Sequence, residues 1–259
     1  MSIQRDGAGI QRAQRGQSPD EKWRNKGMRY RVAVVEDDPM LRENYADTFR
    51  AQGYEVTAYR DRPSAEAGME SLLPDLAVVD IGLGAEVDGG FTLCQWLRGR
   101  SATLPIIFLS ARDDDYDIIS GLRMGADDYV TKDVSLPHLV ARVAALFRRT
   151  EALTSSQTAD DDLLTAGPLT IEPGRMTCRW NGDRVDLTLT EFWIVYALAR
   201  RPGLVKTREQ LMDQARIFVD DATVTSHIKR IRAKFRSLDP AFEGIEAVYG
   251  MGYRWADAS

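Results

Sequence analysis

Short apolar runs alternate with amphipathic segments through the first half of the chain. Runs such as Arg31–Val35 and Leu76–Asp80 are followed by longer stretches in which apolar residues recur every three or four positions. This alternation is typical of a parallel sheet covered by helices on both faces, the doubly wound α/β class. We predict strands at 31–35, 55–59, 76–80, 104–109 and 129–131, and helices at 39–52, 63–72, 91–97, 114–124 and 136–149.

The second half has a different pattern. Residues 167–186 contain short β-like runs broken by Pro173-Gly174 and Asn181-Gly182, which are turn signals. Helical periodicity follows, and the last helix carries an apolar stripe opposite a basic, hydroxyl-bearing face. We predict helices at 190–200, 207–214 and 222–236, the stripe at Val224, Ile228, Ile231 and Phe235, and a glycine-turned hairpin at 245–255. This half is therefore predicted to be a small α+β domain.

The length of 259 residues favours two domains, each with its own core. Residues 1–27 are rich in Gln, Arg and Gly and are predicted to be a disordered tail, which makes Met28 a second candidate start. The first domain is predicted at 28–150, a polar linker at 151–163 and the second domain at 164–257.

Composition and charge narrow the function classes. No apolar run approaches the length of a membrane span and no signal peptide is evident, so we expect a cytoplasmic protein without membrane contact. Two distant cysteines do not support a disulfide framework. The net charge of -5 combines an acidic first domain with a mildly basic second one. A basic cluster in the last helix comprises Lys229, Arg230, Arg232, Lys234 and Arg236.

Polar residues follow the predicted strands of the first domain. Glu36 and Asp37 follow the first strand, Asp80 ends the third, Ser110 follows the fourth and Lys132 follows the fifth. Functional groups of open α/β sheets gather at the carboxyl edge of the strands, so these side chains should converge. Clustered carboxylates repel one another unless they bind a cation, and Mg²⁺ suits carboxylates that also face phosphate. A carboxylate such as Asp80 can attack phosphorus to form an acyl phosphate.

Each of these residues also has an ordinary structural interpretation. An Asp at a strand end is commonly a helix cap, and Asp37 or Asp38 could cap the helix that begins near Pro39. A single Lys at such a position is commonly solvated. The order and strand context of the whole set favour the functional interpretation.

The first domain resembles the receiver domains of response regulators, which have a flavodoxin-like fold. The resemblance is carried by Val34–Asp38, Val79–Asp80, Phe108–Arg112 and Gly125–Lys132. It implies that Asp80 is the phosphoacceptor, and that Mg²⁺ is held by Glu36, Asp37, Asp80 and the Gly82 carbonyl. It also implies that Ser110, Tyr129 and Lys132 respond to the phosphoryl group.

Two features depart from the receiver pattern. Receivers usually carry Lys-Pro, often with a cis bond, where this chain has Lys132-Asp133. The loop after Asp80, at 83–90, is also longer and more acidic than usual, which could alter phosphoryl lifetime and partner access. Together with Phe147-Arg148-Arg149, these features resemble a proteobacterial subgroup associated with dedicated sortase systems.

The second domain resembles the winged helix-turn-helix of the OmpR/PhoB type. The resemblance is carried by 187–192, 208–211, 223–234 and 250–254. A helix with one apolar stripe and a basic face can dock on a core while it enters the major groove. The implied DNA contacts are Ser226 and Arg230 to bases, Thr223, His227 and Arg232 to phosphate, Lys229 and Lys234 within the basic cluster, and Arg254 at the wing. Ala222 and Tyr249 stand where the family often has Arg, which predicts weaker phosphate binding.

The two resemblances together predict a transcriptional regulator rather than an enzyme. A sensor histidine kinase would phosphorylate Asp80, and the protein would dimerise on promoter DNA, with RNA polymerase a further candidate partner. Asp128 and Arg142 match one salt bridge of the family dimer, whereas Ile118 and His138 replace charged residues. A regulator that binds DNA independently of phosphorylation stays an alternative. A haloacid-dehalogenase-like phosphatase is disfavoured, since it needs Asp-x-Asp after its first strand.

Overall fold

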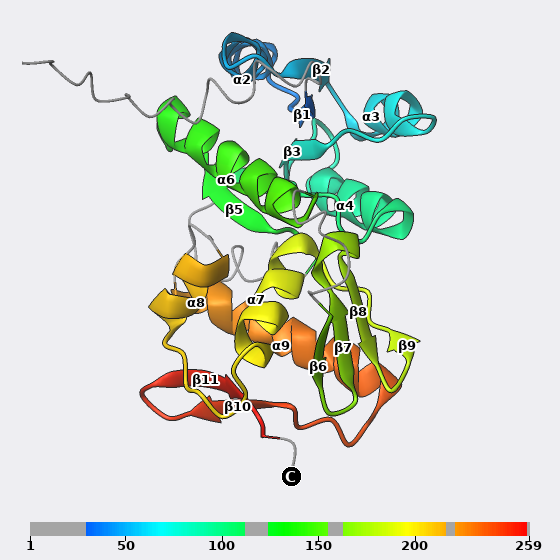
Figure 1. Cartoon of the computed structure of the whole chain (residues 1–259). Helices are drawn as coiled ribbons and strands as arrows, with labels where there is room; N and C mark the ends of the chain where they lie inside the picture. The colour runs from blue at the N-terminus through cyan, green and yellow to red at the C-terminus, as the bar shows by residue number, and fades with distance from the viewer. Residues whose placement is uncertain (1–29, 112–123, 155–162, 216–220, 258–259) are drawn as a thin grey trace, which may run out of the picture.

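The computed structural model describes residues 30–111, 124–154, 163–215 and 221–257, which form two stacked domains (Figure 1). The first contains a five-stranded parallel sheet in the order β2-β1-β3-β4-β5. Its strands are β1 (Arg31–Val35), β2 (Glu55–Tyr59), β3 (Leu76–Asp80), β4 (Ile106–Ser110) and β5 (Asp128–Thr131). The predicted tail 1–27 and nearly all of the predicted helix 114–124 lie outside the described residues.

Helices cover both faces of this sheet. They are α2 (Pro39–Ala51), α3 (Arg62–Met69), α4 (Gly89–Arg100) and α6 (Leu136–Thr154). Because side chains alternate along each strand, Val34 and Val78 pack toward Phe49 of α2, whereas Val35 and Val79 join Leu93 of α4 in a separate core cluster. The predicted doubly wound α/β architecture is confirmed. Helix α6 continues to Thr154, four residues into the predicted linker.

The second domain begins with an antiparallel sheet. Its strands are β6 (Leu164–Ala166), β7 (Leu169–Glu172), β8 (Thr177–Trp180) and β9 (Asp183–Arg184), with a 3₁₀ turn, η1 (Pro173–Arg175), between β7 and β8. The β8–β9 turn has positive φ at both central residues, 52° at Asn181 and 91° at Gly182. An Asn-Gly pair suits this type of two-residue turn, so the turn predicted at these residues is confirmed.

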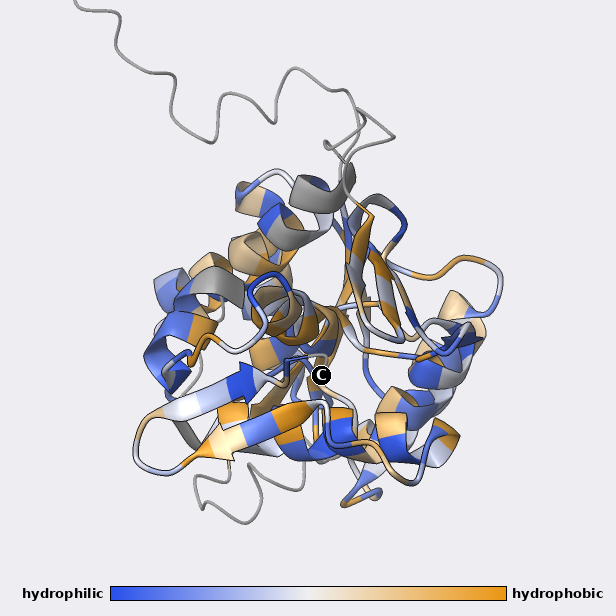
Figure 2. Cartoon of the chain, turned by 60° about the horizontal axis from the view of Figure 1, so that its bottom comes forward, coloured by the Kyte–Doolittle hydropathy of each residue, from blue (hydrophilic) through white to orange (hydrophobic). Residues whose placement is uncertain are grey.

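Three helices and a wing complete the second domain. They are α7 (Leu189–Ala199), α8 (Arg208–Ala215), α9 (Asp221–Leu238), β10 (Ile245–Val248) and β11 (Gly252–Trp255). The predicted apolar stripe of α9 is buried, with Val224, Ile228, Ile231 and Phe235 each at most 1% exposed. Figure 2 brings the wing end forward and shows both hydrophilic and hydrophobic segments along β10 and β11. Among the described residues, no helix has the length and apolarity needed to cross a bilayer.

Candidate functional site

Three carboxylates meet at the carboxyl edge of the receiver-like sheet. Ligand atoms of Glu36, Asp37 and Asp80 all lie within 4.8 Å of one another. Lys132, one residue past β5, bonds through Nζ to Glu36 Oε1 and to Asp80 Oδ2, each at 2.8 Å. The strands β1, β3 and β5 therefore bring together the four residues predicted from their positions at strand ends.

The consecutive acidic residues after β1 have different roles. Asp38 caps α2, because its Oδ1 accepts hydrogen bonds from the backbone N–H groups of Met40 at 2.8 Å and Leu41 at 2.9 Å. Glu36 is fully buried, whereas Asp37 is exposed at the mouth of the cluster. The structural interpretation therefore holds for Asp38 and not for Asp37, which points its carboxylate at the site.

The cluster contains more negative than positive charge. Burial is the largest cause that raises the pKa of Glu36, to about 7, and the charge of Asp80 adds to it although Lys132 opposes it. Burial also raises the pKa of Asp80, with Asp37 adding to it and Lys132 opposing. Burial lowers the pKa of Lys132, but its bonds to Asp80 and Glu36 outweigh this and raise it. One ammonium does not neutralise three carboxylates.

These residues fit a hard divalent cation. The second oxygen of Glu36, Oε2, is buried and has no hydrogen-bond partner among the described residues. A buried oxygen of this kind costs free energy unless a cation or a proton satisfies it. Carboxylate oxygens grouped beside open solvent are the donor set that Mg²⁺ prefers. Glu36, Asp37 and Asp80 are therefore the side chains that would hold Mg²⁺.

The remaining residues predicted for phosphoryl binding surround this edge. Ser110 ends β4 and is 2% exposed, and its carbonyl accepts the Lys132 N–H at 2.7 Å. Tyr129 is 8% exposed and packs with the α4 side of the core. Gly82 lies two residues past Asp80, and its backbone lowers the pKa of the Asp80 carboxyl against the effect of burial. No cis peptide occurs among the described residues, so the Lys132–Asp133 bond is trans.

The residues predicted to contact DNA lie mostly on α9, but several of their side chains are buried. Thr223, Ser226 and His227 are buried at 4%, 8% and 0% exposure, and Lys229 is exposed. Arg232 donates to the Ile245 carbonyl at 2.9 Å, and burial lowers its pKa. At the wing, Arg254 pairs with Glu246 at 2.6 Å.

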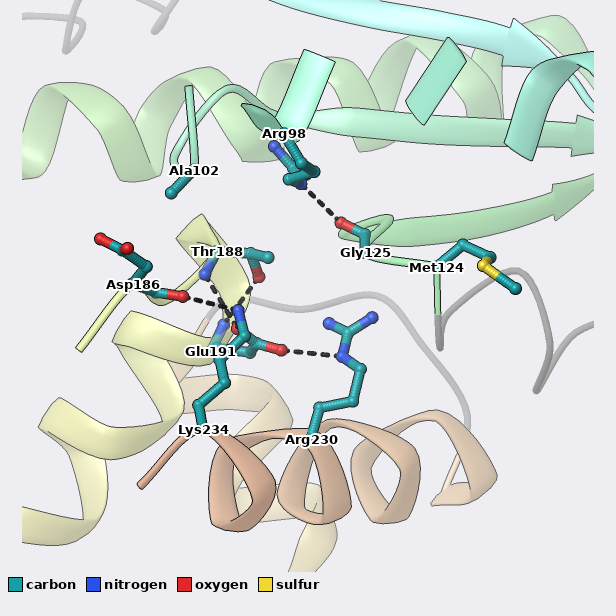
Figure 3. A pocket seen from close by; sticks show the side chains of 9 residues that line it. All are labelled: Arg98, Ala102, Met124, Gly125, Asp186, Thr188, Glu191, Arg230 and Lys234. Carbon is teal, nitrogen blue, oxygen red and sulfur yellow. Dashed lines mark hydrogen bonds and ion pairs between the residues drawn. The ribbon is translucent and has the colours of Figure 1, made fainter. Parts of the chain in front are cut away.

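Arg230 and Lys234 of α9 converge on one buried carboxylate. Arg230 Nε lies 2.7 Å from Glu191 Oε1, and Lys234 Nζ lies 2.6 Å from Glu191 Oε2 (Figure 3). Burial opposes ionisation of Glu191, but the two cations outweigh it and hold its pKa at about 2. Glu191 also closes the capping box of α7 with Thr188.

The same region forms the contact between the two domains. Asp127 is fully buried; its Oδ2 pairs with Arg98 of α4 at 2.7 Å, and its Oδ1 accepts the backbone N–H of Thr190 in α7 at 3.0 Å. Arg230 donates to the Ala126 carbonyl at 3.4 Å. A pocket of about 320 Å³ lies between the domains, lined by residues that include Arg98, Gly125, Glu191 and Arg230 (Figure 3). The predicted base-reading residue Arg230 is therefore engaged by the receiver.

Sequence reasoning did not find this interdomain contact. Thr190 and Glu191 have a predicted role only as part of the 187–192 motif, and Asp127 only as part of the Gly125–Lys132 motif. The predicted dimer residues Asp128 and Arg142 are paired within one chain, at 2.8 Å. Their role between protomers stays a prediction.

Two protein-family models match the two domains of this chain. Residues 32–144 match the response regulator receiver domain, and residues 182–255 match the C-terminal domain of transcriptional regulatory proteins. A transcriptional regulatory protein of Escherichia coli, BaeR, is 38% identical over 88% of this chain and 94% of its own length. The sensory transduction protein RegX3 of Mycolicibacterium smegmatis is 38% identical over 86% of this chain and 97% of its own.

A solved structure of a RitR mutant shares the fold, with a TM-score of 0.70 over 88% of this chain and 100% of that chain at 21% identity. The fold, the acidic site and these matches define a two-component response regulator with a DNA-binding domain, which is not an enzyme. The chain belongs to the OmpR/PhoB family of response regulators. Membership implies DNA and a histidine kinase as partners; the association with sortase systems stays a prediction.

Proposed function

We propose that phosphoryl transfer from a sensor histidine kinase to Asp80 releases α9 from the receiver and so promotes promoter binding. The observation that carries this proposal is the contact of Arg230 with the receiver carbonyl of Ala126 and with Glu191. Arg230 cannot read a base while these contacts hold it, so DNA binding through this residue requires the domains to separate.

The transfer is a nucleophilic displacement at phosphorus. A carboxylate oxygen of Asp80 forms the new O–P bond as the N–P bond of the phosphohistidine breaks, and the kinase histidine keeps the electron pair of that bond. Lys132, already 2.8 Å from Asp80, is positioned to pair with the phosphoryl oxygens, and Ser110 is the predicted hydrogen-bond donor to them. Bound Mg²⁺ would supply positive charge against the phosphoryl oxygens.

Strand β5 offers a physical route from Asp80 to the interdomain contact. Lys132 follows one end of β5, whereas Ala126 and Asp127 precede the other end and contact the second domain. When Lys132 changes partners from carboxylates to a phosphoryl group, β5 and Tyr129 shift their preferred conformation. The phosphoryl group thereby biases an equilibrium between closed and open domain arrangements.

Release of α9 is proposed to accompany dimerisation on DNA. In the dimer, Asp128 of one protomer would pair with Arg142 of the other in place of the pair within one chain. The freed basic face of α9 would enter the major groove, and the wing with Arg254 would lie along the adjacent backbone. RNA polymerase contact stays a prediction.

Phosphorylation with acetyl phosphate and Mg²⁺ tests the site assignment. We expect intact-mass analysis to show one added phosphoryl group on the wild type and none on Asp80→Asn. Asp88→Asn is the matched control, because Asp88 is an exposed acid in the following loop. Labelling of Asp80→Asn at the wild-type level would overturn the assignment. Labelling that never alters DNA affinity would favour the phosphorylation-independent alternative.

A further inference from the structure

The loop between β3 and α4 forms a tight hairpin beside the acidic cluster. Leu83 and Glu86 exchange backbone hydrogen bonds, with N···O distances of 3.0 and 3.2 Å. Gly84 occupies the first central position with a φ of 65°, which a two-residue turn of type II′ requires and which glycine adopts without strain. At the tip, the Gly84 N–H donates to Asp37 Oδ2 at 3.0 Å. The hairpin therefore contacts one of the three carboxylates directly.

Arg62 at the start of α3 holds this hairpin from the side. Its Nε lies 2.7 Å from Glu86 Oε2 and its Nη2 lies 3.1 Å from Glu86 Oε1, a two-pronged pair that fixes direction as well as distance. The Nη1 of Arg62 binds Glu66 at 2.9 Å, which anchors the guanidinium on α3. Arg62 is thus attached both to its own helix and to the hairpin.

The α4 end and the tip of the loop are held by different means. On the α4 side, Gly90 donates to the Ile81 carbonyl at 2.9 Å, and a Cβ at Gly90 would lie only 2.1 Å from the Asp80 carbonyl oxygen. That end is held by close backbone packing. The tip has no such packing, because Gly84 and Ala85 are exposed. Loss of the Arg62–Glu86 pair should therefore free the tip without disturbing α4.

Asp37 is the member of the acidic cluster that needs this support. Lys132 binds Glu36 and Asp80, which are buried, whereas Asp37 is exposed. An exposed carboxylate loses more rotational freedom when it binds a cation than one already held in place. The Gly84 N–H fixes one oxygen of Asp37 and leaves the other for a metal ion.

We propose that Arg62 is a positioning residue for the metal ligand Asp37, acting through Glu86 and the Gly84 amide. The proposal rests on the proposed function, because it assigns Asp37 to the Mg²⁺ that assists phosphoryl transfer. Groups that orient metal ligands typically contribute ten- to a hundredfold to metal affinity. We expect the lower end of that range, because Arg62 acts through two intermediate groups.

Calorimetric titration of the full chain with MgCl₂ tests the proposal. Arg62→Ala and Glu86→Gln should each raise the Kd for Mg²⁺ about tenfold. Arg62→Lys should recover part of the affinity, because it keeps one charged donor toward Glu86. Glu66→Gln is the matched control; it removes the other partner of Arg62, leaves the hairpin pair, and should leave the Kd within about twofold of wild type.

Unchanged Mg²⁺ affinity in both Arg62→Ala and Glu86→Gln, in protein with a normal thermal transition, would overturn the proposal. An equal loss of affinity in Glu66→Gln would also overturn it, because the effect would then come from α3 and not from the hairpin. Mass analysis of phosphorylation distinguishes failure of the positioning role of Arg62 from failure of the proposed function. If Mg²⁺ binding falls as expected but Asp80 accepts no phosphoryl group, the positioning role stands and the proposed function fails.

Discussion

Two charge clusters of opposite composition lie in the two domains. In the receiver, three carboxylates share one ammonium, that of Lys132, and the pKa of Glu36 rises to about 7. In the DNA-binding domain, one carboxylate, Glu191, shares two cations and its pKa falls to about 2. The first cluster is short of positive charge, and the second has a surplus of it.

The difference indicates which ligand completes each cluster. The receiver cluster would gain stability from a divalent cation, since Mg²⁺ would supply the missing positive charge beside Asp37 and Asp80. The second cluster would gain from hydrogen-bond acceptors, and base edges in the major groove offer them once the receiver no longer covers Arg230. In the closed arrangement, the carbonyl of Ala126 accepts a hydrogen bond from Arg230 at 3.4 Å.

The largest expected effect comes from neutralising Glu191. Glu191→Gln leaves Arg230 and Lys234 without their buried counter-charge and should lower the free energy of unfolding by about 3 kcal/mol at pH 7. A folded pKa of about 2, below the unfolded value of 4.5, means that this stabilisation is present above pH 4.5 and is lost as pH falls toward 2. Urea unfolding of both proteins at pH 7 and pH 3.5 measures it.

The difference in the free energy of unfolding between wild type and Glu191→Gln should be about 1 kcal/mol smaller at pH 3.5 than at pH 7. Glu209→Gln is the control, because Glu209 is an exposed acid on α8 and should change stability little. A gap that stays constant with pH would show that Glu191 acts through packing and not through its charge.

A smaller effect is expected from Mg²⁺ on the receiver cluster. Mg²⁺ at ten times its Kd should raise the free energy of unfolding by about 1.4 kcal/mol, and EDTA should reverse the gain. Asp37→Asn removes a ligand and should abolish most of the shift at the same concentration, whereas Asp88→Asn should keep it. Thermal unfolding with and without MgCl₂ measures this, and an equal shift in Asp37→Asn would exclude that carboxylate as a ligand.

The acidic site could be predicted from the sequence because its residues follow apolar strands. Glu36, Asp80 and Lys132 each end or follow a buried run, and parallel strands bring their carboxyl ends to one edge. The bounds of β1, β2 and β3 were predicted for the same reason. The start of α4 was harder to predict, because Asp88 precedes this helix without a side-chain cap bond.

The interdomain contact could not be predicted in the same way. Asp127 and Thr190 are 63 positions apart, and Ala126 and Arg230 are 104 apart. In the sequence, each of these residues belongs to a motif of its own domain. No periodicity links them, because the contact forms between two surfaces and not within one element. The hairpin support by Arg62 was missed for the same reason.

The central claim is that phosphorylation of Asp80 releases the DNA-reading face of α9. Its most direct test is the affinity of the full chain for a duplex selected by the phosphorylated protein from random sequences, measured by fluorescence anisotropy with and without acetyl phosphate. We predict that phosphorylation tightens binding at least tenfold in the wild type, about 1.4 kcal/mol or more, and has no effect in Asp80→Asn. Equal affinity of the phosphorylated and unphosphorylated wild type would contradict the account.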